Sequence, residues 1–489
     1  MSLVLRLSEI IILCLVCSVI SSQLARRIKA NRLGCKPPTT FSLWESIKLF
    51  LGFRDQQNRH TVVAGQVSLH ADYGTTFRRM TPMGLMIHTI DPANLRSVWK
   101  TNFGDWGVEN PRVKVLGEFC GRGVITVDGE LWKKTHRLAM PHFFGKDAPR
   151  VNLAIIEKYF QKYLGNLLDG EVIDLQPLIY AMMFETGYEF LVGESYSKVP
   201  GFEDTSIFEL LDWLEEGEVG SRRRFLRGPL KYFDRDDKWR CACKSVQKFA
   251  EGAIARGRAR MTSGEPTTKD STLIERFIQG FQDPIELRDL VIQVLMGTST
   301  NGPGVLAYIC SQLGKNPRMW KTLQDESMAV GNYGTYLGVE AVRRMSYVSA
   351  GLRMYRITST VFRSANRDTI LPRGGGADGL APIFTPKDTL LFVSIWALHR
   401  DKAVFGSDAE EFNPDRWSVI KPRRWQYMPF GGGPRACMGR KMAITESMYV
   451  LCRLAQCYQG FVGCLGSEQQ KMDCSVILTK NPGVSMNHG

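Results

Sequence analysis

The chain has 489 residues, 44% of them hydrophobic, and no linker, repeat or low-complexity block divides it after residue 40, so one large domain with a large core is expected. The net charge of +14 comes from scattered basic residues without a known nucleic-acid-binding motif, which argues against nucleic acid and favours an anionic membrane surface or an acidic protein as partner. The 12 cysteines show no disulfide framework and no C-x-x-C-H haem attachment, as is typical of a reducing compartment.

An apolar run from Ile10 to Ile20 lies near the start of the chain. Extended from Leu3 to Leu24, it is just long enough to cross a bilayer, and its length also fits a cleaved signal peptide. A basic cluster follows and favours a retained anchor, because positive charges stay on the cytosolic side: Arg26, Arg27, Lys29 and Arg32. We therefore predict a transmembrane anchor with a stop-transfer segment at residues 1–32 and a single domain at residues 33–489.

Helical patterns dominate the remainder, with a turn-rich β segment late in the chain, so we expect a mostly α fold with a small β portion. The segment from Leu287 to Leu313 is predicted as one long helix with an interruption at Gly297 to Gly304. Pro303 lacks an N–H and its ring crowds the carbonyl of Ser299, so the helical hydrogen bonding must open there. Beside the break, the hydroxyl of Thr300 either bonds back to a preceding carbonyl or takes part in chemistry.

A glycine-rich loop from Phe430 to Gly439 contains a single cysteine, Cys437, just before a predicted helix. This is what one thiolate axial ligand to haem iron requires, since glycines let the backbone pass close under a flat macrocycle and Arg435 can pair with a propionate. Two other interpretations are a dinucleotide-binding loop, which Pro434 would interrupt, and a buried structural cysteine.

Five spaced positions in this loop match the haem-binding signature of the cytochrome P450 monooxygenases: Phe430, Gly433, Arg435, Cys437 and Gly439. From about residue 33 to the C-terminus the chain resembles the fungal microsomal branch of that family, which includes alkane and fatty-acid hydroxylases and tailoring enzymes of secondary metabolism. The motifs that carry this resemblance are Gly34-Cys-Lys-Pro-Pro38, Leu371-Pro-Arg-Gly-Gly-Gly376 and Phe412-Asn-Pro-Asp-Arg-Trp417. The resemblance implies the cytochrome P450 fold, preceded by an N-terminal membrane anchor helix.

The resemblance also implies roles for single residues. Cys437 would be the metal ligand of haem b, and Thr300 would help to deliver protons to bound dioxygen, with Ser299 in the place of the family's acidic residue. Propionate contacts would come from Trp132, from His136 at the position of the family's arginine, and from two arginines, Arg137 and Arg363.

Two departures from the family pattern stand out. A serine at position 299 passes a proton along a hydrogen-bonded chain but cannot hold a negative charge near neutral pH. Ala350 takes the place of the glutamate that normally binds two arginines, here Arg353 and Arg416. Two arginines without their carboxylate repel each other, so another acid such as Asp415, or backbone carbonyls, must replace it.

The resemblance implies a monooxygenase that inserts one oxygen atom of O2 into a hydrophobic small molecule, in secondary-metabolite tailoring or in fatty-acid or alkane hydroxylation. NADPH would supply electrons through the NADPH–cytochrome P450 reductase, and the chain would be a single-pass protein of the endoplasmic reticulum membrane with its catalytic domain in the cytosol. Two alternatives stay open: a haem-thiolate isomerase or dehydratase, favoured by Ser299, and a degenerate, non-catalytic haem protein, favoured by Ala350.

Overall fold

The structure is a computed structural model that describes residues 17, 21–42, 44–48, 65–81, 84–144, 148–228, 231, 235–263, 272–335, 337–354, 360–463 and 474–480. The apolar run of the predicted anchor lies outside these residues except for Cys17, whereas residues 21–32 are helical. Within these ranges, the apolar stretches of the helices are too short for any helix to qualify as a membrane span.

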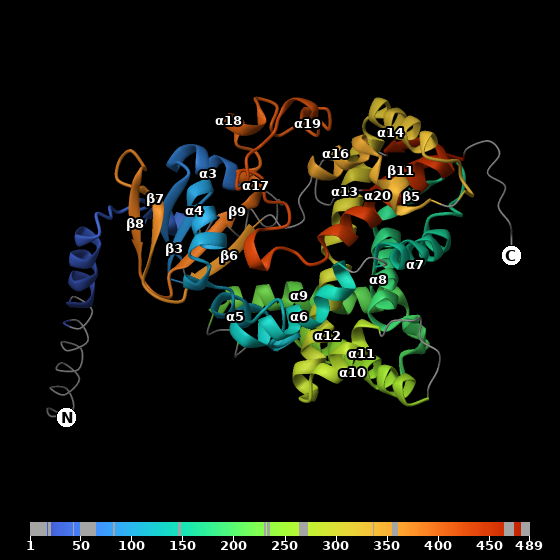
Figure 1. The fold of residues 1–489 in the computed structure, drawn as a ribbon, viewed down its shortest axis with the longest axis horizontal. Coiled ribbons are helices and arrows are strands. Elements are labelled where there is room, and N and C mark those ends of the chain that lie inside the picture. The colour runs from blue at the N-terminus through green and yellow to red at the C-terminus, as the bar shows by residue number, and fades with distance from the viewer. Residues whose placement is uncertain are drawn as a thin grey trace.

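A mixed sheet forms one side of the molecule, which lies at the left of Figure 1. In the described residues it has six strands in the order β1, β2, β3, β9, β6 and β4, with the bounds Thr39–Thr40, Thr76–Thr81, Gly84–Thr89, Leu390–Ser394, Thr360–Ala365 and Trp106–Gly107. A separate hairpin pairs β7 with β8 beside it. The hairpin strands are β7 (Thr369–Gly375) and β8 (Ala381–Thr385). The helices of this side are α3 (Gly65–Tyr73), α4 (Pro92–Arg96), η1 (Ser97–Thr101), η2 (Phe103–Asp105) and α17 (Ile395–Leu398).

Helices form the larger part of the molecule, and a three-stranded sheet, in the order β10, β11 and β5, packs among them. This confirms the predicted mostly α fold with a small β portion. The helices and strands of this part are α5 (Glu109–Cys120), α6 (Gly129–Phe144), α7 (Ala148–Tyr163), β5 (Val172–Asp174), α8 (Leu175–Val192), η3 (Tyr196–Lys198), α9 (Ile207–Leu226), α10 (Asp237–Ser263), α11 (Leu273–Gly280), α12 (Pro284–Ser299), α13 (Asn301–Gly314), α14 (Pro317–Ala329), α15 (Val339–Arg343), α16 (Ser346–Met354), α18 (Lys402–Phe405), α19 (Arg416–Val419), η5 (Gly433–Arg435), α20 (Arg440–Cys457), β10 (Tyr458–Gly463) and β11 (Ser475–Lys480).

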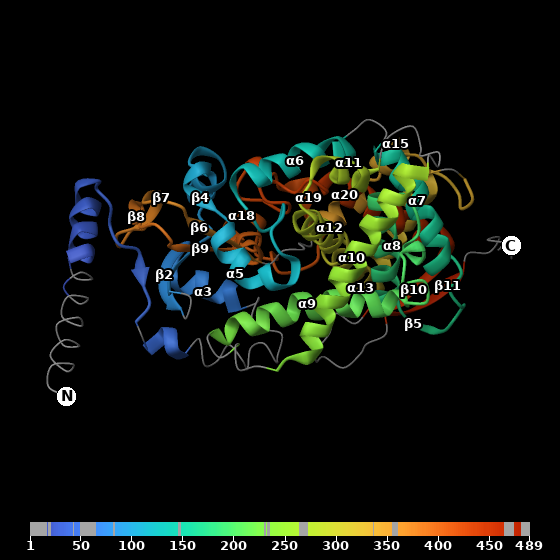
Figure 2. The same cartoon turned by 90° about the horizontal axis from the view of Figure 1, so that it is seen from below.

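The two central helices α12 and α13 follow one another through the helical part and are separated only by Thr300 (Figure 2). Asp283 begins α12, because its carboxylate accepts from the backbone N–H of Ile285. Pro303 lies in the first turn of α13, where no intrahelical partner is needed for the missing N–H. The predicted interruption of one long helix is therefore confirmed, and its cause is the proline.

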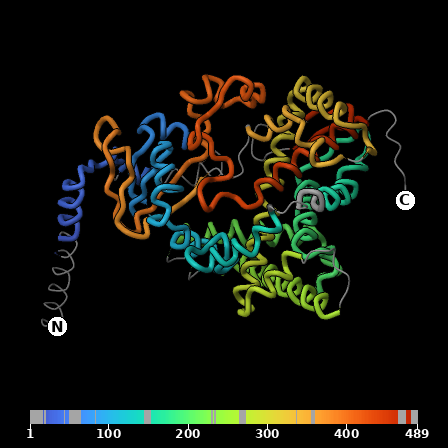
Figure 3. Tube along the Cα trace, viewed as in Figure 1, coloured from blue at the N-terminus to red at the C-terminus, as the bar shows by residue number. Residues whose placement is uncertain are grey.

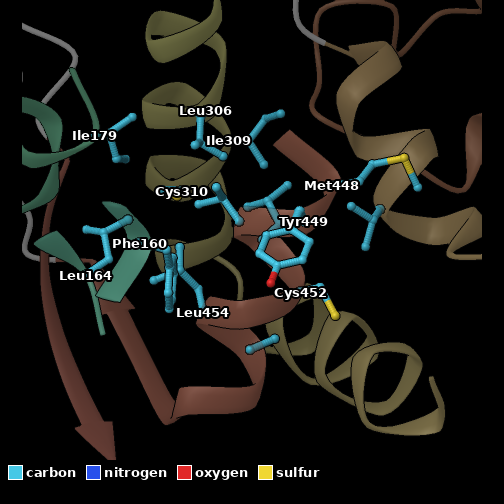
Figure 4. Close-up of a cluster of buried hydrophobic side chains, with 14 of the residues drawn as sticks. Phe160, Leu164, Ile179, Leu306, Ile309, Cys310, Met448, Tyr449, Cys452 and Leu454 are labelled. Atoms are coloured by element: carbon cyan, nitrogen blue, oxygen red, sulfur yellow. The ribbon is translucent and has the colours of Figure 1, made fainter. Parts of the chain in front are cut away.

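A hydrophobic core joins α13 to the helices around it and to α20, which follows the cysteine loop (Figure 4). Its side chains are buried, and each fully buried Leu, Ile or Phe among them contributes about 1.5–3 kcal/mol. Representative members are Phe160 of α7 and Leu164 just after it, Ile179 of α8, Leu306 and Cys310 of α13, and Leu454 of α20. This core fixes the start of α20, and with it the cysteine loop, against the central helices.

The segment at residues 21–32 lies at the sheet end of the molecule, whereas β11 lies at the opposite end (Figure 3). The ammonium of Lys29 binds the carboxylate of Asp368 at 2.8 Å, and the backbone N–H of Lys36 donates to the carbonyl of Pro382 at 2.9 Å. The chain is thus attached to the sheet side from its first described helix onward.

Candidate functional site

Cys437 lies in the loop that leads into α20. Its backbone N–H donates to the carbonyl of Phe430 at 3.0 Å, which closes the loop, and Gly439 begins the helix. Cys437 is an exposed residue of this loop, although its thiol is partly shielded from solvent. Desolvation raises the pKa of its thiol, whereas the backbone N–H of Gly439 and the charge of Arg440 lower it, so the loop already holds groups that stabilise a thiolate.

Gly433 holds this loop against the sheet side of the molecule. Its φ of +64° is rare for other residues, and a Cβ built on it would lie 1.7 Å from the carbonyl oxygen of Trp99 in η1. No side chain fits at that distance, so glycine is required here for both conformation and space.

The side chain of Arg435 is only 7% exposed and lies beside α6 and α5. Its guanidinium binds the carboxylate of Asp128 at 2.8 Å and lies 4.5 Å from the ring centre of Trp132. Asp128 in turn accepts the backbone N–H groups of Val108 and Glu109 at 2.8 Å each, and thereby fixes the start of α5. Arg435 is therefore held in place by the protein itself, before any cofactor binds.

Two further arginines, Arg112 of α5 and Arg363 of β6, lie close to Arg435. Burial lowers the pKa of Arg112 to about 10, and the charge of Arg435 adds to this effect. Burial also lowers the pKa of Arg363, and the charges of Arg112 and Arg435 lower it further. Asp128 raises the pKa of all three and Glu109 raises that of Arg435, but Glu109 also binds Arg122, so positive charge remains in excess.

The surplus of positive charge around Asp128 needs anions, because buried unpaired cations are costly. The two propionates of a haem held by Cys437 would supply two negative charges to these arginines. The donor set therefore fits a haem group. Arg112 escaped the sequence analysis, because nothing around it in the sequence distinguishes it from the other scattered basic residues.

The predicted propionate residues of α6 have different surroundings. The rings of Trp132 and His136 lie 5.3 Å apart, and the pKa of His136 is lowered by desolvation and by the charge of Arg435. Arg137 is exposed, and together with Lys133, which has the larger effect, it lowers the pKa of the Glu130 carboxyl. The structure thus brings Trp132 and His136 to the arginine cluster, while Arg137 faces solvent.

The hydroxyls at the break between α12 and α13 bond back into α12. Ser299 is fully buried and donates to the carbonyl of Leu295 at 2.7 Å. Thr300 donates to the carbonyl of Met296 at 3.0 Å. Because a hydroxyl also carries two acceptor lone pairs, each oxygen keeps the capacity to accept a proton donor while it makes this bond.

Arg416 is buried, and its counter-ion is Asp408, not the Asp415 that the sequence suggested. The carboxylate of Asp408 lies 2.8 Å from the guanidinium, which also donates to the carbonyls of Asp408, Ala409 and Glu411. Arg353 is exposed and lies 5.7 Å from the ring centre of Trp417. The two arginines therefore have separate partners, which is how the chain avoids their repulsion without a glutamate at position 350.

The loop between α5 and α6 is bound to α12 by Gln293, whose side chain is almost completely buried. Its amide oxygen accepts the backbone N–H of Ile125 at 2.7 Å. Its amide nitrogen donates to the hydroxyl of Thr126 at 2.9 Å and to the carbonyl of Cys120 at 3.0 Å. Sequence patterns gave no signal for this residue, since a glutamine in a helix is usually on the surface.

Replacing Gln293 by leucine should destabilise the protein by about 1–3 kcal/mol, because the N–H of Ile125 and the buried carbonyl of Cys120 lose their partner. The midpoint of denaturant unfolding measures the change. The control is Gln247→Leu in α10, where the amide makes one long hydrogen bond of 3.4 Å to the carbonyl of Phe119, and where we expect little effect. Equal effects of the two changes would contradict a binding role of Gln293.

Comparisons with known proteins identify the family of the chain. The family model described as cytochrome P450 matches residues 37–487. The chain is 30% identical over 461 residues to the cytochrome P450 monooxygenase fsdH of Fusarium heterosporum, which covers 90% of this chain and 80% of that protein. It is also 30% identical over 417 residues to the cytochrome P450 monooxygenase himC of Aspergillus japonicus, a match that covers 82% of this chain and 74% of that protein. The identity to cytochrome P450 52A3-B of Candida maltosa is 30% over 410 residues, which cover 78% of this chain and 77% of that protein.

Proposed function

The chain belongs to the cytochrome P450 family, and we propose that it is a haem-thiolate monooxygenase that inserts one atom of O2 into a hydrophobic small molecule. The observation that carries the proposal is Cys437, an exposed residue in a loop held by the largely buried, cationic side chain of Arg435. When bound, haem supplies the activation of O2, for which a thiolate ligand is an electron donor. The protein would hold the haem through Cys437, Arg435, Arg363 and Arg112.

The proposed substrate is a fatty acid, an alkane or a secondary metabolite. Support comes from the resemblance to the fungal branch that contains such enzymes and from similarity to fungal monooxygenases. A carbon monoxide difference spectrum of the reduced protein tests the haem-thiolate assignment. A substrate screen with NADPH and a reductase then tests the activity, and absence of the thiolate band would refute the proposal.

A reductase is the proposed electron donor, with NADPH as the source of electrons. Exposed basic residues surround the cysteine loop and the start of α6 and could attract an acidic partner: Lys133, Lys134, Arg423, Arg424, Arg440 and Lys441. For location we propose the endoplasmic reticulum membrane, with residues 1–32 as the anchor and residues 33–489 as the haem domain. Fractionation of cells that express the chain with and without residues 1–32 tests this location.

The alternative function, an isomerase or dehydratase that needs no reductase, is favoured by Ser299 in place of an acid. In the monooxygenase, Thr300 would hold a proton donor at its Oγ1 atom while it donates to Met296. Proton supply would then pass through Thr300, Ser299 and water, since neither side chain holds a negative charge near neutral pH. Substrate-dependent NADPH consumption separates the two functions.

Replacing Thr300 by valine should lower the product formed per NADPH by roughly tenfold, because water replaces only part of what a positioned hydroxyl contributes. The lost electrons should appear as hydrogen peroxide, while substrate binding stays nearly unchanged, since valine has a similar volume. The matched control is Thr298→Val, which removes a hydroxyl that bonds back to Leu295 at 3.0 Å in the same turn of α12. If both variants behave like the unaltered protein, Thr300 serves the helix only.

A further inference from the structure

A small cavity lies beside Arg416, and two buried N–H groups without partners belong to residues that line it. One is Nε of Arg416, which stays free although the rest of the guanidinium is bound. The other is Nδ1 of His399, a residue that is 1% exposed. Nε2 of His399 accepts the backbone N–H of Met428 at 2.7 Å, so the ring hydrogen is on Nδ1.

Two buried donors without acceptors are costly, at least as costly as a lost hydrogen bond each. The volume of the cavity is about 10 Å³, which is enough for one water molecule. A single water in this cavity could accept from both donors. Glu410 and Glu411 also line the cavity, and their backbone or side-chain oxygens would accept the hydrogens of that water.

The helix that lacks the family's glutamate runs next to this cavity. A Cβ on Gly351 would lie 3.9 Å from the ring of Phe412, and the guanidinium of Arg353 lies 5.7 Å from the ring of Trp417. Both rings line the cavity. Ala350 directly precedes Gly351 on α16, so the position of the missing glutamate belongs to the helix that borders this cavity.

We propose that Asp408 and one bound water together replace the glutamate that is missing at position 350. Asp408 supplies the charge and the water satisfies the remaining donors of Arg416 and His399. The pKa of the Asp408 carboxyl is lowered, first by its hydrogen bond with Arg416 and then by its hydrogen bond with Asn413, so it is ionised at neutral pH. Asp408 is thus a positioning residue, because it acts on the haem site through other residues.

The path from Asp408 to the cysteine loop consists of direct contacts. Trp417 follows Arg416, and its ring packs 4.9 Å from the ring of Tyr427. The next residue, Met428, is bound to His399. Two residues later, the carbonyl of Phe430 accepts the backbone N–H of Cys437. Loss of the charge on Asp408 would therefore loosen the segment that holds the cysteine.

This inference rests on the proposed function only for its haem measurements, so the first measurement uses the haem-free protein. Asp408→Ala should lower its melting temperature, whereas Asp415→Ala should not, because Asp415 is exposed and does not bind Arg416. In the haem-loaded protein, Asp408→Ala should release haem about tenfold faster, a modest factor because the Asp408 side chain is 35% exposed. Asp408→Asn, which keeps the shape, serves if the alanine variant does not fold.

Rescue is the decisive measurement. Ala350→Glu should restore the melting temperature and the haem retention of Asp408→Ala, and it should add little to the unaltered protein, where Arg416 already has a counter-ion. A purely local stabilising role of Asp408 predicts no rescue from position 350. Absence of rescue, or equal behaviour of the Asp408 and Asp415 variants, would overturn the proposal even if the unaltered protein shows the thiolate band.

The water is tested separately by a crystal structure of the haem-loaded protein. One ordered water within hydrogen-bonding distance of both Nε of Arg416 and Nδ1 of His399 supports its role. An empty cavity would overturn this half of the proposal. A missing thiolate band in the unaltered protein would instead refute the proposed function and leave the melting-temperature comparison intact.

Discussion

Replacing Cys437 by serine is expected to abolish thiolate-ligated haem. A serine hydroxyl stays protonated near neutral pH, whereas a thiol that binds a metal loses its proton. The loop itself should survive, because the backbone N–H of residue 437 still donates to the carbonyl of Phe430. The carbon monoxide difference spectrum of the reduced protein measures the loss, which should be complete.

The matched control is Cys241→Ser in α10, another exposed cysteine that lies on a helix far along the chain from the loop. This variant should keep the full long-wavelength thiolate band. If the Cys437 variant also keeps it, another cysteine binds the iron and the assignment of the metal ligand is wrong. A variant that keeps haem without the band would show that the arginine cluster binds the porphyrin independently of the sulfur.

Features that depend on short stretches of sequence were predictable. The interruption between α12 and α13 follows from Pro303 and its neighbours alone, and the structure has it one residue beyond Ser299. The turns within the cysteine loop follow from its own glycines, since each positive φ is set locally. Such features need no knowledge of which segments meet in the fold.

Features that depend on distant contacts were not predictable. Arg112 becomes part of the site only because α5 lies next to Arg435 and Arg363, which are hundreds of residues away in the sequence. The partner of Arg416 was missed for a subtler reason. Asp415 is its neighbour in sequence, but consecutive residues do not face each other at the start of a helix, whereas the preceding loop brings Asp408 back to it.

Replacing Gly433 by alanine is expected to abolish haem binding almost as completely as removing Cys437. The new Cβ would lie 1.7 Å from the carbonyl oxygen of Trp99, which is backbone and cannot rotate away, so the loop or η1 must move. The positive φ of +64° adds a further cost of about 1–2 kcal/mol. Since Arg363 lies 4.7 Å from the ring of Trp99, movement of η1 would also disturb the arginine cluster.

Gly379→Ala separates the two causes, because Gly379 has a similar φ of +67° but nothing within 4 Å of its ideal Cβ. This control carries the conformational cost alone, so it should keep haem and lose only about 1–2 kcal/mol of stability. Haem content and the midpoint of denaturant unfolding measure both variants. If the two substitutions have equal effects, the contact between the loop and Trp99 contributes nothing. A much larger loss for Gly433→Ala would mean that close packing of the cysteine loop against η1 is what positions Cys437 for haem binding.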